Sequence, residues 1–176
     1  VGNEDIEAAR ITLNSFLQQG EADWTLHVTA SVEVFEDLNP CLDQRCIRRT
    51  TGQFDGEAPY AAFIEPGDQL EEKALTRIAV ILEANPATVL LFTDEDRIDR
   101  TGDHVSARLK AGWSDDQLLL GDNLGQLCIF SRQHMHDAAA SLDAVEDLRG
   151  LPQTSAFWLY ALKLAVMEGV KPEQII

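Results

Sequence analysis

The chain has 176 residues, of which 45% are hydrophobic and 25% are charged, and its formal net charge at pH 7 is −16. That length and composition predict one soluble globular domain with a core of its own. The acidic surface repels nucleic-acid backbones and anionic membranes, and no apolar run reaches the roughly 18 residues of a transmembrane helix, so neither a nucleic-acid partner nor a membrane span is expected.

The cysteines give an expectation for the compartment. The chain has three of them, Cys41, Cys46 and Cys128. An odd and small number predicts free thiols and a reducing, cytoplasmic location rather than a disulfide framework. A structural zinc site needs four ligands, and no second Cys/His pair joins Cys41 and Cys46, so zinc is not expected.

Helical and strand periodicities alternate along the first hundred residues. In chain order the patterns predict a helix over 4–19, a strand over 24–30, mostly loop over 36–58 with a short strand around Ile47, a strand over 59–64, a helix over 70–84 and a strand over 88–93. Beyond these, they predict a short helix over 114–121, a strand over 126–130 and a helix over 154–169 that ends at Gly169. This alternation predicts an α/β fold with a mainly parallel sheet.

Two acidic turns follow predicted strands, "EPGD" at 65–68 and "DED" at 94–96. In open parallel sheets, ligands bind beyond the carboxyl ends of the strands. Neighbouring carboxylates there can converge on Mg²⁺ or Mn²⁺, which accept few protein ligands and leave positions for phosphate oxygens. For residues 94–96 the alternative is a solvated turn in an acidic protein, and the residues alone leave both interpretations open.

A longer pattern surrounds the second turn. The stretch "LLFTDEDRID" and the residues after it, up to Arg132, resemble the family 2 glycosyltransferases of the GT-A fold, in particular their rhamnosyltransferase-like branch. Residues 93–99 match that branch's "YSDEDKID" run, and Lys110 and Trp113 match its "FKPDWSPDLLL" run. Upstream matches are Ser15, Gln19, Trp24, Leu26, Asp68 and Leu70. The resemblance covers nearly all of 1–176 as a single domain, and the termini look like those of a fragment cut from a longer protein.

The resemblance implies a GT-A-like three-layer α/β/α sandwich that transfers a sugar from a nucleotide-sugar donor to a saccharide or other hydroxyl acceptor. It implies a role in polysaccharide biosynthesis, a divalent Mn or Mg ion, and further domains of a longer chain as partners. The residues that it assigns to metal binding are Glu65 and Asp68, and those that it assigns to donor binding are Asp94, Asp96, Lys110 and Trp113.

The sequence departs from the family pattern where the chemistry is expected. Gly67 stands at the second metal position, Ala30 and Ser31 replace acids that bind the donor base, and Phe157 and Leu159 replace acids near the general base. No general base is therefore identified, and such a base typically contributes roughly 10²- to 10⁴-fold in rate. The alternative function is a degenerate glycosyltransferase-like module that binds or scaffolds without turnover.

Overall fold

The structure is a computed structural model, and it describes residues 5–20, 23–49, 56–146 and 155–176. The chain forms two compact units. Unit 1 consists of Val1–Gly56 with Ile64–Pro86, and unit 2 of Glu57–Phe63 with Ala87–Ile176. The predicted boundaries of a single domain over 1–176 remain a prediction.

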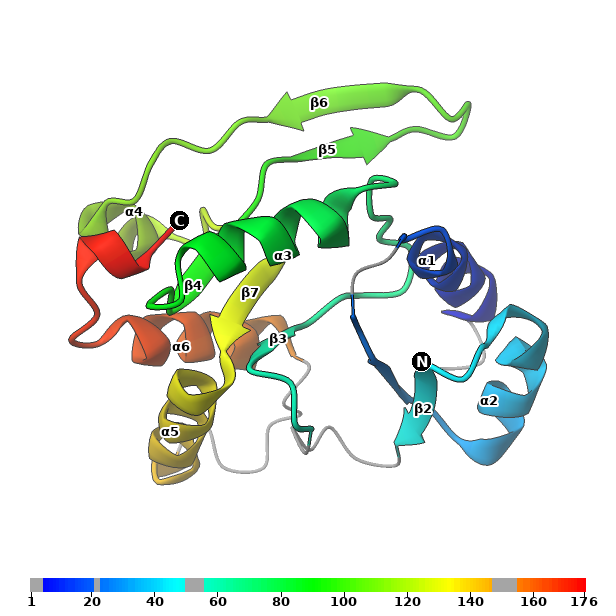
Figure 1. The fold of residues 1–176 in the computed structure, drawn as a ribbon, viewed down its shortest axis with the longest axis horizontal. Helices are drawn as coiled ribbons and strands as arrows, with labels where there is room; N and C mark the ends of the chain where they lie inside the picture. The colour runs from blue at the N-terminus through cyan, green and yellow to red at the C-terminus, as the bar shows by residue number, and fades with distance from the viewer. Residues whose placement is uncertain (1–4, 21–22, 50–55, 147–154) are drawn as a thin grey trace. The chain divides into compact units, whose positions relative to one another are not determined.

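Unit 1 contains the parallel strands (Figure 1). Its elements are α1 (Ile6–Leu17), β1 (Leu26–Thr29), α2 (Val32–Leu38), the 3₁₀ turn η2 (Asn39–Cys41), β2 (Cys46–Arg49) and α3 (Ala74–Ala84). Strands β1 and β2 pair in parallel, with Leu26 opposite Cys46 and Thr29 opposite Arg49.

The core of unit 1 lies between α1, α2 and the strand β1. One helical face of α1 contributes Ala9 and Leu13, and one face of α2 contributes Val34 and Leu38, which is fully buried. The spacing of four residues in each pair places both side chains on the same side of their helix. Ser31 is the N-cap residue of helix α2, and its Oγ accepts a hydrogen bond from the Val34 N–H.

Unit 2 is built on a three-stranded sheet in the order β3 (Tyr60–Ala62), β7 (Cys128–Ser131) and β4 (Leu90–Phe92). Figure 1 shows β7 between the other two, and it runs antiparallel to both. The far edge of β4 is also paired, because Leu90 forms a parallel bridge with Ile175. Both edges of β4 are therefore hydrogen-bonded.

The remaining elements of unit 2 are the antiparallel hairpin of β5 (Glu95–Ile98) and β6 (His104–Arg108), the helices α4 (Asp115–Leu120), α5 (Arg132–Asp143) and α6 (Ala156–Met167), and the 3₁₀ turn η4 (Pro172–Gln174). Helices α5 and α6 pack against each other. Phe63 packs edge to face on both Phe130 and Trp158, with ring centroids 6.4 Å apart in each case.

The predicted α/β class is confirmed, since helices and strands are mixed in both units. The prediction of a mainly parallel sheet is confirmed only for β1 and β2, which pair in parallel. In unit 2, β3 and β4 both pair antiparallel with β7. A short apolar run predicts burial but not strand direction, so the pattern at 126–130 could not give the orientation of β7. The sequence also did not predict α2, α5 or the hairpin. The helices that the structure describes are all too short to cross a membrane.

Candidate functional site

The acidic turn at residues 65–68 is fastened to helix α1. The Gly67 N–H donates to the Ala8 carbonyl oxygen (3.1 Å) and to Thr12 Oγ1 (2.9 Å). The Asp68 carboxylate accepts the Glu65 N–H at 3.1 Å, which closes the turn. Gly67 has a φ of +102°, a conformation that glycine adopts without strain. The residue that departs from the family pattern therefore has a backbone role.

A polar stripe of Thr12, Ser15 and Gln19, along α1 and just beyond its end, holds the segment that follows the turn. All three residues are buried; Thr12 and Ser15 lie three residues apart on α1, and Gln19 follows the helix. Ser15 Oγ accepts the Leu70 N–H at 3.1 Å, and Gln19 Oε1 accepts the Leu75 N–H at 3.0 Å. Ser15 and Gln19, which contribute to the family resemblance, thus bind backbone and position the chain between the turn and α3.

The turn offers two carboxylates to a cation. Glu65 is exposed and Asp68 is half-buried. Within the described residues, no group of three or more His, Cys, Asp or Glu side chains is arranged to hold a metal ion. The pair does not suit a closed structural site, but it fits Mg²⁺ or Mn²⁺, which bind through one or two carboxylates together with substrate phosphates. Metal binding by Glu65 and Asp68 remains a prediction.

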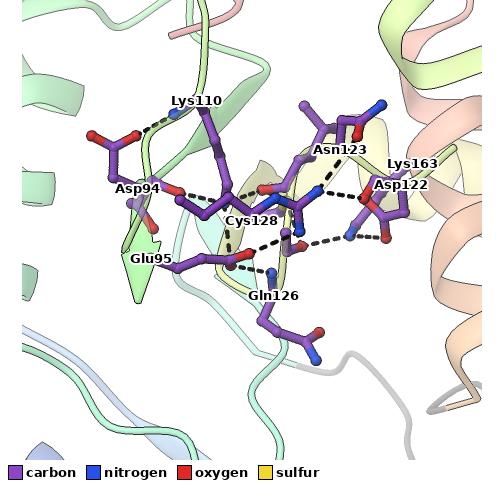
Figure 2. A network of polar contacts seen from close by, with 12 residues as sticks. Asp94, Glu95, Lys110, Asp122, Asn123, Gln126, Cys128 and Lys163 are labelled. Carbon is purple, nitrogen blue, oxygen red and sulfur yellow. Dashed lines mark hydrogen bonds and ion pairs between the residues drawn. The ribbon is translucent and has the colours of Figure 1, made fainter. Parts of the chain in front are cut away.

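In unit 2, Lys110 lies inside a polar network (Figure 2). Its ammonium donates to the Thr93 carbonyl oxygen, to the Leu124 carbonyl oxygen (2.6 Å) and to Glu95 Oε2 (3.2 Å), and its side chain is 5% exposed. An ammonium has three N–H donors, so these acceptors use all of them. The Lys110 N–H donates to Asp94 Oδ1 at 2.7 Å, which brings these two predicted donor-binding residues together.

Glu95 receives three hydrogen bonds in this network. Its carboxylate accepts from the Arg108 guanidinium (3.1 Å), the Lys110 ammonium (3.2 Å) and the Gln126 N–H (3.0 Å). Burial raises the pKa of Glu95, but the Gln126 N–H and the charges of Lys110 and Arg108 together outweigh burial, so the pKa lies below its ordinary value. Glu95 is therefore an anion at neutral pH.

The loop between α4 and β7, residues 121–127, is bound by three cations. Besides Lys110, Arg108 donates to the Asp122 carbonyl oxygen at 3.3 Å. From helix α6, the buried Lys163 donates to Asp122 Oδ2 (2.6 Å) and to the Gly125 carbonyl oxygen (2.8 Å). Figure 2 shows these contacts converging on the loop from both sides. Because a buried lysine is costly without partners, Lys163 is stable here only through these two acceptors.

Gly125 allows this close approach. Its φ is +76°, and a Cβ built there would lie 2.1 Å from Lys110 Nζ and 2.2 Å from Glu95 Oε2. Behind the loop, Cys128 is buried, and burial raises the pKa of its thiol to about 11. A buried thiol that stays protonated is a poor nucleophile, so Cys128 is expected to have a packing role.

The other two predicted donor-binding residues are Asp96 and Trp113. The Asp96 carboxylate contacts His104 Nδ1 at 2.8 Å across the exposed hairpin. Trp113 is half-buried just before α4. Glu65 and Asp68 belong to unit 1, whereas Asp94, Asp96, Lys110 and Trp113 belong to unit 2. No described contact tests these assignments, and they remain predictions.

The charged side chains Glu95, Arg108 and Lys163 belong to the network but were not predicted as site residues. Lys163 did carry a signal, since a lone lysine within the apolar run "AFWLYALKLAVM" requires buried partners. Glu95 and Arg108 carried none, because they pair across the hairpin and sequence spacing alone does not give that register.

Comparisons with known proteins give two distant relatives. No family model matches the chain. It is 27% identical over 117 residues to the uncharacterized protein y4gI of Sinorhizobium fredii (strain NBRC 101917 / NGR234), which covers 66% of the chain and 12% of that protein. It is 26% identical over 91 residues to the O-antigen biosynthesis protein RfbC of Myxococcus xanthus, which covers 52% of the chain and 7% of that protein. The chain therefore spans a small part of either relative's length.

Proposed function

We propose that the chain is a glycosyltransferase-like domain that transfers a sugar from a nucleotide-sugar donor to a saccharide or other hydroxyl acceptor. The observation that carries the proposal is the similarity to RfbC, a protein named for O-antigen biosynthesis. The family 2 pattern over residues 93–132 supports the same function, and with it a GT-A-like three-layer sandwich as the fold.

The acidic turn is the proposed place of a divalent cation. Glu65 and Asp68 would hold Mn or Mg, and the ion would offset the charge on the departing diphosphate. Thr12 and Gly67 would fix the turn that presents these carboxylates. This division of roles makes Asp68 the residue whose loss should be most damaging.

The donor is proposed to contact Asp94, Asp96, Lys110 and Trp113. The three N–H donors of Lys110 already bind protein acceptors, so its first role would be to position the Thr93 and Leu124 carbonyl groups and Glu95 at the donor site. A glycan acceptor, a cytoplasmic location and other domains of a longer chain complete the proposal. The free thiols of Cys41, Cys46 and Cys128 are consistent with that location.

A thermal-shift experiment with the full chain tests the donor site. Nucleotide-sugars with different bases are screened with and without Mn²⁺, and a donor at a hundredfold over its dissociation constant should add about 2.7 kcal/mol of stability. Asp68→Ala should abolish the metal-dependent part of the shift. Glu83→Ala removes the same charge from an exposed position on α3 and should leave the shift intact. Absence of a shift with every donor, or equal shifts in both variants, contradicts the proposal.

A second candidate function is donor binding without turnover. It is favoured by how the structure uses the substituted positions: Ala30 packs in the core of unit 1, and Ser31 caps α2. Sugar release from a bound donor, followed by NMR with and without acceptor glycans, separates the two candidates. Turnover that Asp68→Ala abolishes excludes the binding module, whereas binding without any sugar release supports it.

A further inference from the structure

The contacts of Glu95 form an anion-binding cradle that a protein side chain fills. One guanidinium, one ammonium and one backbone N–H surround its carboxylate, with donor–acceptor distances of 3.0–3.2 Å. Charge-assisted donors combined with a backbone N–H are the usual components of carboxylate and phosphate sites. The side chain of Glu95 is 27% exposed and that of Arg108 is 47% exposed, so the cradle is open to solvent on one side.

The cradle does not depend on Glu95 for its shape. Lys110 is also held by the Thr93 and Leu124 carbonyl oxygens, and Arg108 by the Asp122 carbonyl oxygen. These contacts remain if the Glu95 carboxylate turns outward. The donors would then stay in place without the anion that they now bind.

The charge balance also favours an incoming anion. Arg108 and the Lys110 ammonium both donate to Glu95, whereas Asp94 accepts only the Lys110 backbone N–H and the Asp122 carboxylate binds Lys163. With Glu95 turned out toward solvent, these two cations would present two positive charges at the vacated position, within a protein of net charge −16. Such a local reversal of charge is what a phosphorylated ligand needs in order to approach an acidic surface.

We propose that this cradle binds a phosphoryl oxyanion and that Glu95 is a built-in competitor for it. The ligand displaces the Glu95 carboxylate from Arg108, Lys110 and the Gln126 N–H. Its apparent dissociation constant is the intrinsic one divided by the fraction of molecules in which Glu95 has turned out. Glu95 would thereby keep binding weak and readily reversible. The inference deepens the proposed function, because a nucleotide-sugar carries a diphosphate, but the binding itself requires no sugar and no transfer.

Calorimetric titration of the full chain with inorganic phosphate and with pyrophosphate tests the cradle. Glu95→Gln keeps the shape of the side chain and removes its charge, and we expect both anions to bind at least about tenfold more tightly. Asp143→Asn is the matched control, since it removes the same charge from an exposed position at the end of α5, outside the network and outside the proposed donor site. It should change the affinity less than about twofold, because exposed charges are screened by salt.

Adding Lys110→Met to Glu95→Gln should remove the gain in affinity. A preference for pyrophosphate would indicate a diphosphate ligand, and equal affinities a single phosphoryl group. The wild-type chain provides a second measurement that does not depend on folding of a variant: phosphate should shift the Gln126 amide resonance, and sodium chloride of equal ionic strength should not. Glu95→Gln that binds no better than Asp143→Asn, or an unchanged Gln126 resonance, overturns the inference. Neither result depends on sugar transfer, so the proposed function is tested separately.

Discussion

Replacing Gly125 by alanine tests the packing of the network most directly. The added Cβ would lie 2.1 Å from Lys110 Nζ, 2.2 Å from Glu95 Oε2 and 2.7 Å from Glu95 Cδ. All three separations are well below van der Waals contact. Glu95 can move because its side chain is partly exposed, but Lys110 is buried and bound to two carbonyl oxygens. The substitution should therefore displace the ammonium or distort the loop.

The size of the effect follows from two contributions. A residue with a Cβ at a φ of +76° costs about 1–2 kcal/mol relative to glycine. Loss of one hydrogen bond from a charged donor costs about 1.5–3 kcal/mol when the acceptor is buried. Gly125→Ala should thus lower the free energy of unfolding of unit 2 by about 2.5–5 kcal/mol.

Gly169 supplies the control for backbone strain. Its φ is +77°, almost the same as that of Gly125, and an added Cβ there meets no atom within 4 Å. Gly169→Ala should cost only the backbone contribution of about 1–2 kcal/mol. Urea unfolding in a Trp24→Phe background reports on unit 2, because Trp113 and Trp158 both belong to it. Equal destabilisation by the two substitutions, within about 0.5 kcal/mol, would refute the proposed clash with Lys110.

Three further predictions concern other parts of the chain. Thr12→Val removes the oxygen that accepts the Gly67 N–H, so it should cost about 1 kcal/mol in urea unfolding and weaken the Mn²⁺-dependent donor shift, whereas Thr12→Ser should keep both. The pKa of Glu95 is lowered in the folded state, so its contribution to stability is present above the unfolded pKa and is lost as the pH falls through the folded pKa. In Glu95→Gln the free energy of unfolding, measured in urea, should therefore fall less between about pH 5 and pH 3 than in the wild-type chain, and an equal fall would contradict this. With a pKa raised to about 11 by burial, Cys128 should react with a thiol reagent at pH 8 only as fast as the chain unfolds, and labelling at the rate of an exposed thiol would show that it is accessible.

The sequence predicted those elements whose periodicity is strong. Helix α1 has apolar residues at helical spacing, and β4 is a continuous apolar run, so both were found close to their observed bounds. Helix α2 has only seven residues, two of them valines, and it depends on the Ser31 cap and on burial of Val34 and Leu38. Such tertiary contributions are not visible in a local pattern. The direction of β7 likewise could not be predicted from its short apolar run.

The network around Lys110 could be predicted only in part. The resemblance singled out Lys110 and Asp94, and the structure brings them together. It could not indicate that Lys110 binds the Leu124 carbonyl oxygen, because a backbone acceptor leaves no trace in residue type. The same applies to the Gln126 N–H beneath Glu95. Backbone groups make half of this site, and their positions follow from the fold and not from the residues that carry them.

The two candidate functions, donor binding and sugar transfer, depend on residues that differ in how much they contribute to stability. Thr12, Ser15 and Gln19 are buried and hydrogen-bonded, so replacing any of them leaves unsatisfied polar groups and costs stability. A general base that faces solvent contributes little to folding and can be lost while the fold remains. A buried stripe that holds the acidic turn, with Phe157 and Leu159 at positions where the family resemblance leads us to expect acids, is therefore the pattern expected of a domain that binds a donor without turnover. The donor-binding measurement thus comes first, because both functions require it, and turnover alone decides between them.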